Sequence, residues 1–185
     1  MRHLLLPAML SLLLAACGSS QSPVDAGRYV GGAVSLECAP FARALTGLAL
    51  RGDAADWWDR AEGRYARTHA PQVGGVLVLT RSSRLPYGHV AVVSHVLERR
   101  KILVTQANWV HHRVTEDQAV IDVSPANDWT ELRVFWPPSG QMGAGVYAAR
   151  GFIVPGRKTT HDEIARATPY SSLKRTSESD TCCGS

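Results

Sequence analysis

Apolar and polar residues alternate along the middle of the chain in the way that half-buried β-strands do. The pattern predicts six strands, at residues 75–80, 89–97, 101–108, 119–123, 132–136 and 151–154. Ahead of them, apolar residues recur at helical spacing around Phe41, Leu45 and Leu48, and a second helical stretch covers residues 54–67. Helices that come first and strands that follow predict an α+β fold, with N-terminal helices packed on an antiparallel sheet.

Both ends of the chain lack this periodicity. Residues 1–16 hold a short apolar run behind a polar head, which is typical of a secretion signal and too short for a transmembrane helix. Residues 17–33 are rich in Ser, Gly and Pro and predict a flexible tether. Residues 156–185 predict a mostly disordered tail with a short helix near 162–167. The folded domain is therefore expected at residues 34–155.

The charge of the chain indicates its surroundings only loosely. The 185 residues carry a formal net charge of +4, and the isoelectric point is near 9.1. Cell-wall polymers or phospholipid head groups would suit that charge, and so would an ordinary surface with no anionic partner. The arginines are scattered and no nucleic-acid-binding motif is present, so we predict no nucleic-acid partner. We also expect no cofactor, and a monomer.

One internal cysteine and one histidine stand where they could form a nucleophilic pair. Cys38 precedes the first predicted helix, and Pro40 suits the first turn of that helix. A helix N-terminus and a nearby imidazole both lower the pKa of a thiol. His89 opens an apolar strand and can supply the imidazole. Taken alone, a cysteine at a helix start is more often a small core residue, but the pair predicts a cysteine hydrolase.

The register of the hairpin that His89 opens selects a third residue. A four-residue turn pairs Leu97 with Ile102. Asn108 then lies diagonal to His89, about 7 Å away and within side-chain reach. Gln106 lies one pair further off. We therefore predict that Asn108 orients the imidazole, a task for which a neutral amide oxygen suffices.

Three motifs together resemble the CHAP domain, the cysteine- and histidine-dependent amidohydrolase/peptidase family. The similarity runs in order from about Glu37 to Pro155. The motifs are Glu37-Cys38-Ala39-Pro40-Phe41-Ala42-Arg43, Gly88-His89-Val90-Ala91-Val92-Val93 and Gln106-Ala107-Asn108-Trp109. The resemblance implies a papain-like fold of the CHAP/NlpC-P60 type.

The resemblance also implies roles for single residues. Cys38 would be the nucleophile and His89 the general base. Many family members carry an acid two residues before the asparagine, where this chain has Gln106. The resemblance therefore implies a Cys38-His89-Asn108 site. We also expect Gln106 and Trp109 to bind substrate, with Trp109 at the rim of the cleft because it follows Asn108 at the end of the strand. One oxyanion donor would be the backbone N–H of Cys38, and a second is not identified.

The first segment ends in Leu14-Ala15-Ala16-Cys17, which resembles a bacterial lipoprotein signal. This resemblance implies that Cys17 is lipidated and becomes the first mature residue, so that the protein is anchored in a membrane of the cell envelope and faces the periplasm. A plain cleaved signal, and hence a secreted protein, is the alternative.

A metal site is not predicted. His89, His111 and His112 could form a histidine cluster, but no acidic or thiolate ligand stands at a suitable spacing. The chain also has no C-x-x-C or H-E-x-x-H motif. His95 is interpreted as a structural residue.

These features predict a membrane-tethered amidase or endopeptidase that cuts an amide bond in peptidoglycan stem peptides or cross-bridges. The residues alone support thiol-dependent amide hydrolysis, and the family resemblance supplies the substrate class. Two alternatives stay open. The first is a catalytically silent lipoprotein that binds wall peptides, because Gln106 replaces the common acid and a second oxyanion donor is missing. The second is an amidase that acts on a small amide outside the wall.

Overall fold

The computed structural model describes residues 28–30 and 37–167. The predicted signal, the lipidation site at Cys17 and the end of the predicted tail lie outside the described residues.

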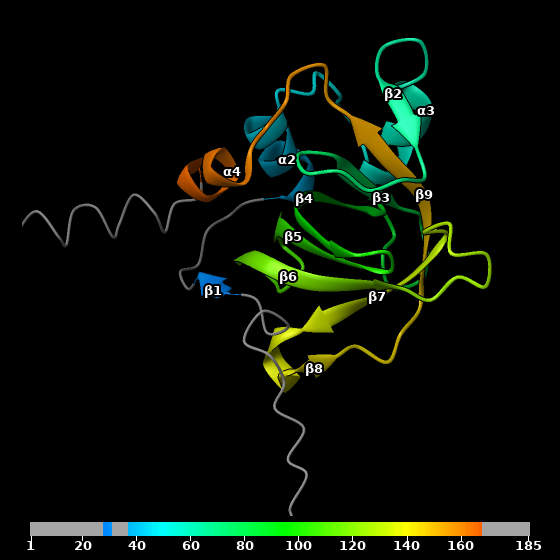
Figure 1. Ribbon diagram of the computed structural model, residues 1–185, viewed down its shortest axis with the longest axis vertical. Coiled ribbons are helices and arrows are strands. Elements are labelled where there is room, and N and C mark those ends of the chain that lie inside the picture. The colour runs from blue at the N-terminus through cyan, green and yellow to red at the C-terminus, as the bar shows by residue number, and fades with distance from the viewer. Residues whose placement is uncertain (1–27, 31–36, 168–185) are drawn as a thin grey trace, which may run out of the picture.

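The described chain is predominantly β, and its strands are named here in chain order (Figure 1). The six strands predicted from the alternating pattern are all present, as β3, β4, β5, β6, β7 and β9. The strands are β1 (Arg28–Val30), β2 (Ala66–Thr68), β3 (Val76–Leu79), β4 (His89–Glu98), β5 (Lys101–Ala107), β6 (Val114–Asp122), β7 (Glu131–Trp136), β8 (Gln141–Met142) and β9 (Tyr147–Val154).

The helices are few and short. They are α2 (Cys38–Thr46), η1 (Ala54–Asp56), α3 (Trp57–Arg60), η2 (Pro137–Ser139) and α4 (His161–Ala167). The long helix predicted over residues 54–67 is wrong. It is replaced by η1, α3 and a turn through Gly63, where φ is 69°. The chain then enters β2, which pairs with β9. A tertiary strand pairing has therefore overridden the local helical pattern.

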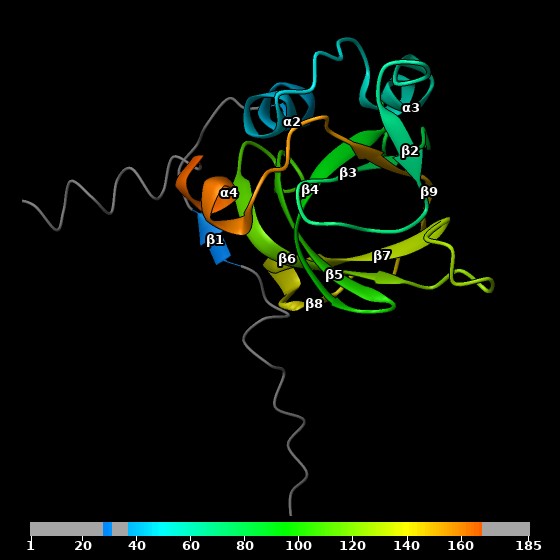
Figure 2. The same ribbon diagram turned by 45° about the horizontal axis from the view of Figure 1, so that its top comes forward.

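Six strands close into a barrel, so the prediction of a simple sheet is also wrong. The antiparallel ladder runs β6, β5, β4, β3, β9 and β7, and β7 pairs again with β6. Figure 2 shows the strands β3 to β7 and β9 arranged around a common centre. Alternation reports which face of a strand is buried but not whether the last strand meets the first, so closure could not be read from the pattern.

The barrel separates two apolar clusters. Alternate side chains of its strands fill the interior, where Ala91, Val93, Val104 and Phe152 are buried. The opposite faces of β3 and β4 carry Val76, Val78, Val90 and Val92, which pack against the helices. These helices lie on one side of the barrel in Figure 1.

Helix α4 matches the short helix predicted near residues 162–167. Its Ile164 is 1% exposed and belongs to the same cluster as Phe41 and Leu45 of α2. The packed structure therefore continues past residue 155. Within residues 28–30 and 37–167, no helix has both the length and the apolar character needed to cross a membrane.

Candidate active site

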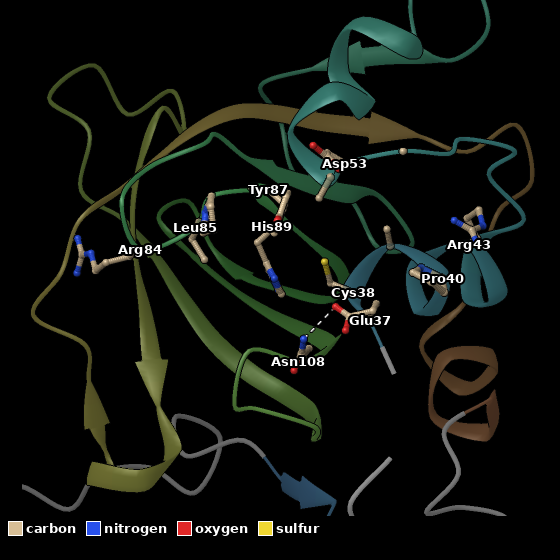
Figure 3. Close-up of a pocket in the computed structure, with 15 residues that line it drawn as sticks. Glu37, Cys38, Pro40, Arg43, Asp53, Arg84, Leu85, Tyr87, His89 and Asn108 are labelled. Atoms are coloured by element: carbon tan, nitrogen blue, oxygen red, sulfur yellow. Dashed lines mark hydrogen bonds between the residues drawn. The ribbon is translucent and has the colours of Figure 1, made fainter. Parts of the chain in front are cut away.

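Helix α2 places Cys38 at the edge of a pocket. The helix begins at Cys38, and Phe41, Ala42 and Leu45 are buried beneath it, which holds it on the barrel. Gly47, with φ at 73°, ends the helix. The Cys38 side chain is half-buried and points into the pocket on the side of the His89 ring (Figure 3).

Gly88 delivers His89 to its strand. Its φ is +70°, and an added Cβ atom would lie 2.6 Å from the Ala55 Cβ atom and 2.7 Å from the carbonyl oxygen of Leu79. Only glycine fits this close approach without movement of the backbone. Glycine is therefore required directly before His89, because the chain passes close to η1 at this point. The His89 side chain that follows is buried at the end of the barrel.

The His89 ring is held by a buried glutamine. His89 Nε2 lies 2.9 Å from Gln106 Oε1. Both side chains are nearly inaccessible, at 4% and 2% exposed. Gln106 in turn donates from Nε2 to Gln118 Oε1 at 2.7 Å, and the Thr115 hydroxyl donates to the same oxygen at 2.6 Å. Gln118 Nε2 donates to the backbone carbonyl of Phe135 at 2.7 Å.

The last link of this chain determines the tautomer of His89. A backbone carbonyl only accepts hydrogen bonds, so the amide nitrogen of Gln118 must face Phe135 and its oxygen must face Gln106. Gln106 then presents its nitrogen to Gln118 and its oxygen to His89. A ring nitrogen facing that oxygen must carry the proton. His89 is therefore protonated on Nε2, and Nδ1 is left as an acceptor.

Asn108 does not take the role predicted for it. Asn108 Nδ2 donates to Glu37 Oε2 at 3.0 Å, and its Oδ1 accepts from the backbone N–H of His112 at 2.9 Å. Asn108 lines the pocket and, with φ at 62°, begins a turn closed by its backbone hydrogen bond to Arg113. It therefore anchors the segment that enters α2, and Gln106 is the amide that contacts the imidazole.

The error came from the register of the hairpin. Next to the turn, the predicted pairing of Leu97 with Ile102 is wrong by only one residue, because Ile102 pairs with Val96 and Lys101 with Glu98. Two bulges in β4, between Val96 and Glu98 and between Val93 and His95, then shift the ladder. As a result Val93 faces Val104, where Gln106 was expected. The two-residue shift moves Gln106 into the place expected for Asn108.

The two residues predicted to bind substrate are placed differently from that prediction. Gln106 is 2% exposed inside the barrel, so it has no access to a substrate, and its prediction as a substrate-binding residue is wrong. Trp109 is half-buried, and its ring meets His89 edge-on with the centroids 5.1 Å apart. Its other neighbour is Tyr147, also at 5.1 Å. Trp109 thus covers one side of the imidazole and shields it from water.

Burial determines the protonation of the pair. Burial lowers the pKa of His89 from 6.5 to about 4, against a smaller opposing effect of its hydrogen bond to Gln106. Burial also raises the pKa of Cys38 above its ordinary value, more than the backbone hydrogen bonds from Val90 and Ala39 lower it. The expected depression of the thiol pKa is therefore wrong. At neutral pH the pair is a thiol beside a neutral imidazole.

The pocket itself is an open cavity of about 570 Å³. Charged side chains of both signs line it, at Arg43, Asp53, Arg84 and Glu37. The far wall is apolar, with Leu85 and other neutral residues of the loop before His89. A pocket of this size and mixed polarity suits a short peptide-like segment carrying charged groups.

Sequence reasoning missed Gln118, Thr115 and Glu37. Gln118 and Thr115 lie in the N-terminal half of β6, which was predicted to start only at residue 119. The available signal was Gln106 itself, a polar residue within the apolar run of β5, because a buried amide requires hydrogen-bond partners on a neighbouring strand. The partner strand starts at Val114, so a search of its polar residues would have found them.

Comparison with known proteins identifies one family. Residues 27–108 match the model of the CHAP domain, and this match includes Cys38, His89 and Gln106. CHAP domains are generally hydrolases of the amidase and peptidase type. No curated protein matches the sequence.

Proposed function

Because residues 27–108 match the CHAP domain, we propose that the protein is a cysteine-dependent amide hydrolase that cuts peptidoglycan. The observation that carries this proposal is the buried amide chain behind His89. It leaves Nδ1 of a neutral imidazole as a proton acceptor beside a thiol at a helix N-terminus. That is the order of groups in a papain-like Cys-His-amide site.

The reaction follows from these groups. His89 Nδ1 takes the thiol proton as Cys38 Sγ attacks the carbonyl carbon, and the negative charge moves to the carbonyl oxygen. The backbone N–H of Cys38 holds that oxygen. The imidazolium, stabilised through Gln106, then gives its proton to the leaving amine, and a thioester remains. Water, deprotonated by His89, hydrolyses the thioester and restores the thiol.

Peptidoglycan is the proposed substrate because stem peptides combine amide bonds with free carboxylates and amines. The pocket beside Cys38 offers Arg43 to carboxylates and Glu37 to amines, whereas Asp53 is already paired with Arg81 at 2.9 Å. The net charge of +4 favours approach to an anionic wall. The bond cut would be the muramoyl–L-alanine amide or one within the stem or cross-bridge.

Digestion of purified peptidoglycan tests this function. The full chain should release soluble fragments carrying one new amine and one new carboxylate per cut, measured by amine labelling and mass spectrometry. Release of intact fragments without new amines would contradict hydrolysis, and binding to the wall without release would favour the silent-binder alternative. Cleavage of small amides alone would favour the alternative of an amidase that acts on a small amide outside the wall.

The pH dependence of turnover is expected to reflect the buried imidazole. Since the pKa of His89 is about 4, the base is neutral above that pH and protonated below it. The acid limb of kcat/KM should therefore lie near pH 4 rather than near 6.5. In Gln106→Glu, a carboxylate would face the ring and favour the imidazolium, so the limb should move up by about one to two pH units. Rates measured from pH 3.5 to 8 check this.

The matched control for that profile is Gln141→Glu, which makes the same change at an exposed position of β8. Its acid limb should coincide with that of the unchanged protein.

The depressed pKa of His89 also affects the stability of the fold. The unfolded chain binds a proton at His89 near pH 6.5 and the folded chain only near pH 4, so stability is lost as the pH falls through this window, by at most about 3.4 kcal/mol. The pH dependence of turnover is therefore compared only over the pH range in which each variant remains folded.

We also propose that Cys17 is lipidated and anchors the protein in the envelope, facing the periplasm. Cys17→Ser should move the protein from the membrane fraction to the soluble fraction, because a thiol-linked lipid would be lost. Fractionation followed by mass spectrometry of the N-terminus measures both attachment and processing. A correctly processed Cys17→Ser protein that stays in the membrane fraction would indicate another tether.

A further inference from the structure

Three side chains from distant parts of the sequence meet on the barrel surface away from Cys38. His95 lies on β4, Asp117 on β6 and His161 at the start of α4. One ligand atom from each lies within 4.8 Å of the others. His95 stands six positions after His89 in β4, which corresponds to about 20 Å along a strand. We call these residues the His-Asp-His cluster, and we propose that it binds a zinc-class divalent transition metal ion.

The distances within the cluster suit shared ligation better than hydrogen bonding. His95 Nδ1 lies 3.5 Å from Asp117 Oδ1, and His161 Nε2 lies 3.7 Å from Asp117 Oδ2. Both exceed the usual range of a nitrogen–oxygen hydrogen bond, about 2.7–3.2 Å. Donor atoms bound to one zinc ion at about 2.0–2.1 Å in a tetrahedron lie about 3.3 Å apart. A small inward movement of the side chains would therefore complete the geometry.

A second observation concerns His95 Nδ1. This atom is buried and has no hydrogen-bond partner within the described residues. A buried ring nitrogen without a partner is costly unless something binds it. A metal ion held between His95 and Asp117 would supply that partner.

His161 has a carboxylate near each of its ring nitrogens. Its Nδ1 lies 3.5 Å from Asp162 Oδ1, slightly longer than a hydrogen bond, while Nε2 faces Asp117. A ligating histidine ordinarily directs its other ring nitrogen to a carboxylate, which fixes the tautomer. Asp162 provides this second carboxylate, and together with Asp117 it balances the charge of a divalent cation.

Two backbone irregularities assemble the cluster. The β4 bulge beside Ser94 turns His95 to the outer face, and Asp117 has a positive φ of 53° at the bulge of β6. The loop before α4 is held by the close approach of Thr159 to Gly74, where an added Cβ atom would lie 2.8 Å from the Thr159 carbonyl oxygen. Asp117 and His161 lie outside the family match to residues 27–108, and His95 lies within it.

The metal would pin helix α4 to the barrel. Ile164 of α4 packs in the cluster of apolar residues that also holds α2, the helix that carries Cys38. Ion binding between β4, β6 and α4 would therefore stabilise the support of the active site without contributing a group to it. The two nitrogen donors favour zinc-class ions over calcium or magnesium, which prefer oxygen ligands.

Metal titration of the full chain in detergent tests the proposal. Cys182→Ser and Cys183→Ser form the background, because thiolates bind zinc independently. After removal of metal with EDTA, zinc chloride should bind at about one ion per chain. At saturating zinc the midpoint of thermal unfolding should rise by about 5 °C. Calcium chloride at the same concentration should leave the midpoint unchanged.

Variants assign the site. His161→Gln and Asp117→Asn should each weaken zinc binding at least tenfold and remove the thermal shift, and Asp162→Asn should weaken it less. His111→Gln and His112→Gln are the matched controls, because these stacked histidines, with centroids 3.7 Å apart, lie elsewhere. Both controls should bind zinc as the background protein does.

The proposal is wrong if the background protein binds no zinc at micromolar concentration. It is also wrong if His161→Gln and Asp117→Asn keep full affinity, or if calcium gives the same shift. Folding of each variant is checked by its metal-free unfolding midpoint. Because His161 and Asp117 side chains are each 37% exposed, at least one of the two variants is expected to fold.

Discussion

Cys38→Ala is expected to lower peptidoglycan hydrolysis by about 10⁴-fold or more, because the nucleophile of the proposed reaction is lost. The substitution removes one sulfur atom from a half-buried side chain at the start of α2. The fold should therefore persist, with an unfolding midpoint within a few degrees of the unchanged protein. Cys38→Ser should be similarly inactive, since a hydroxyl is far harder to deprotonate than a thiol.

The matched control replaces the cysteines outside the site. Cys182→Ala and Cys183→Ala together should keep full turnover. Initial rates of amine release from peptidoglycan are measured for the unchanged protein and for the three variants. Wild-type turnover in Cys38→Ala would show that another group attacks the amide, and the cysteine mechanism would have to be abandoned.

Gln106→Ala is expected to reduce turnover by about ten to several hundred fold, a loss of about 1.4 to 3.5 kcal/mol of transition-state stabilisation. Gln106 holds the Nε2–H of His89, which leaves Nδ1 as the atom that takes the thiol proton in the proposed reaction. Without this acceptor the ring can rotate or change its tautomer. The loss should appear in kcat rather than in KM, because Gln106 is buried and does not reach substrate.

Asn108→Ala is the comparison that decides between the two amides. It removes hydrogen bonds to Glu37 and His112 but leaves the His89 contact intact, so turnover should fall by no more than about fivefold, or ~1 kcal/mol. Gln106→Leu preserves side-chain volume and should be as inactive as Gln106→Ala, which separates a lost hydrogen bond from a cavity. A greater loss in Asn108→Ala than in both Gln106 variants would restore Asn108 to the site.

The positions of Cys38 and His89 in their elements were readable from local patterns. A helix that starts at Cys38 and a strand that starts at His89 follow from apolar spacing within ten residues on either side. The short helix α4 and the six barrel strands were readable for the same reason. The resemblance that pointed to the CHAP family also rests on such local motifs, and the family match confirms it.

The identity of the third residue depended on pairing between strands. Gln106 lies in β5 and Asn108 two positions later, just past the end of the strand, and two bulges in β4 select between them. A bulge leaves apolar alternation nearly unchanged along the chain but shifts every pair beyond it. The orientation of the Gln106 amide required a further partner, the Phe135 carbonyl on β7, which no local pattern connects with His89.

Local patterns therefore determined the chemistry-bearing side chains, the six barrel strands and the resemblance to the CHAP domain. The tertiary structure alone decided the closure of the barrel, the direction of the pKa shifts, the amide that holds His89 and the meeting of His95, Asp117 and His161. The physical reason is that burial and hydrogen-bond partners depend on residues far apart in sequence, whereas the spacing of apolar residues reports only the element in which each residue lies.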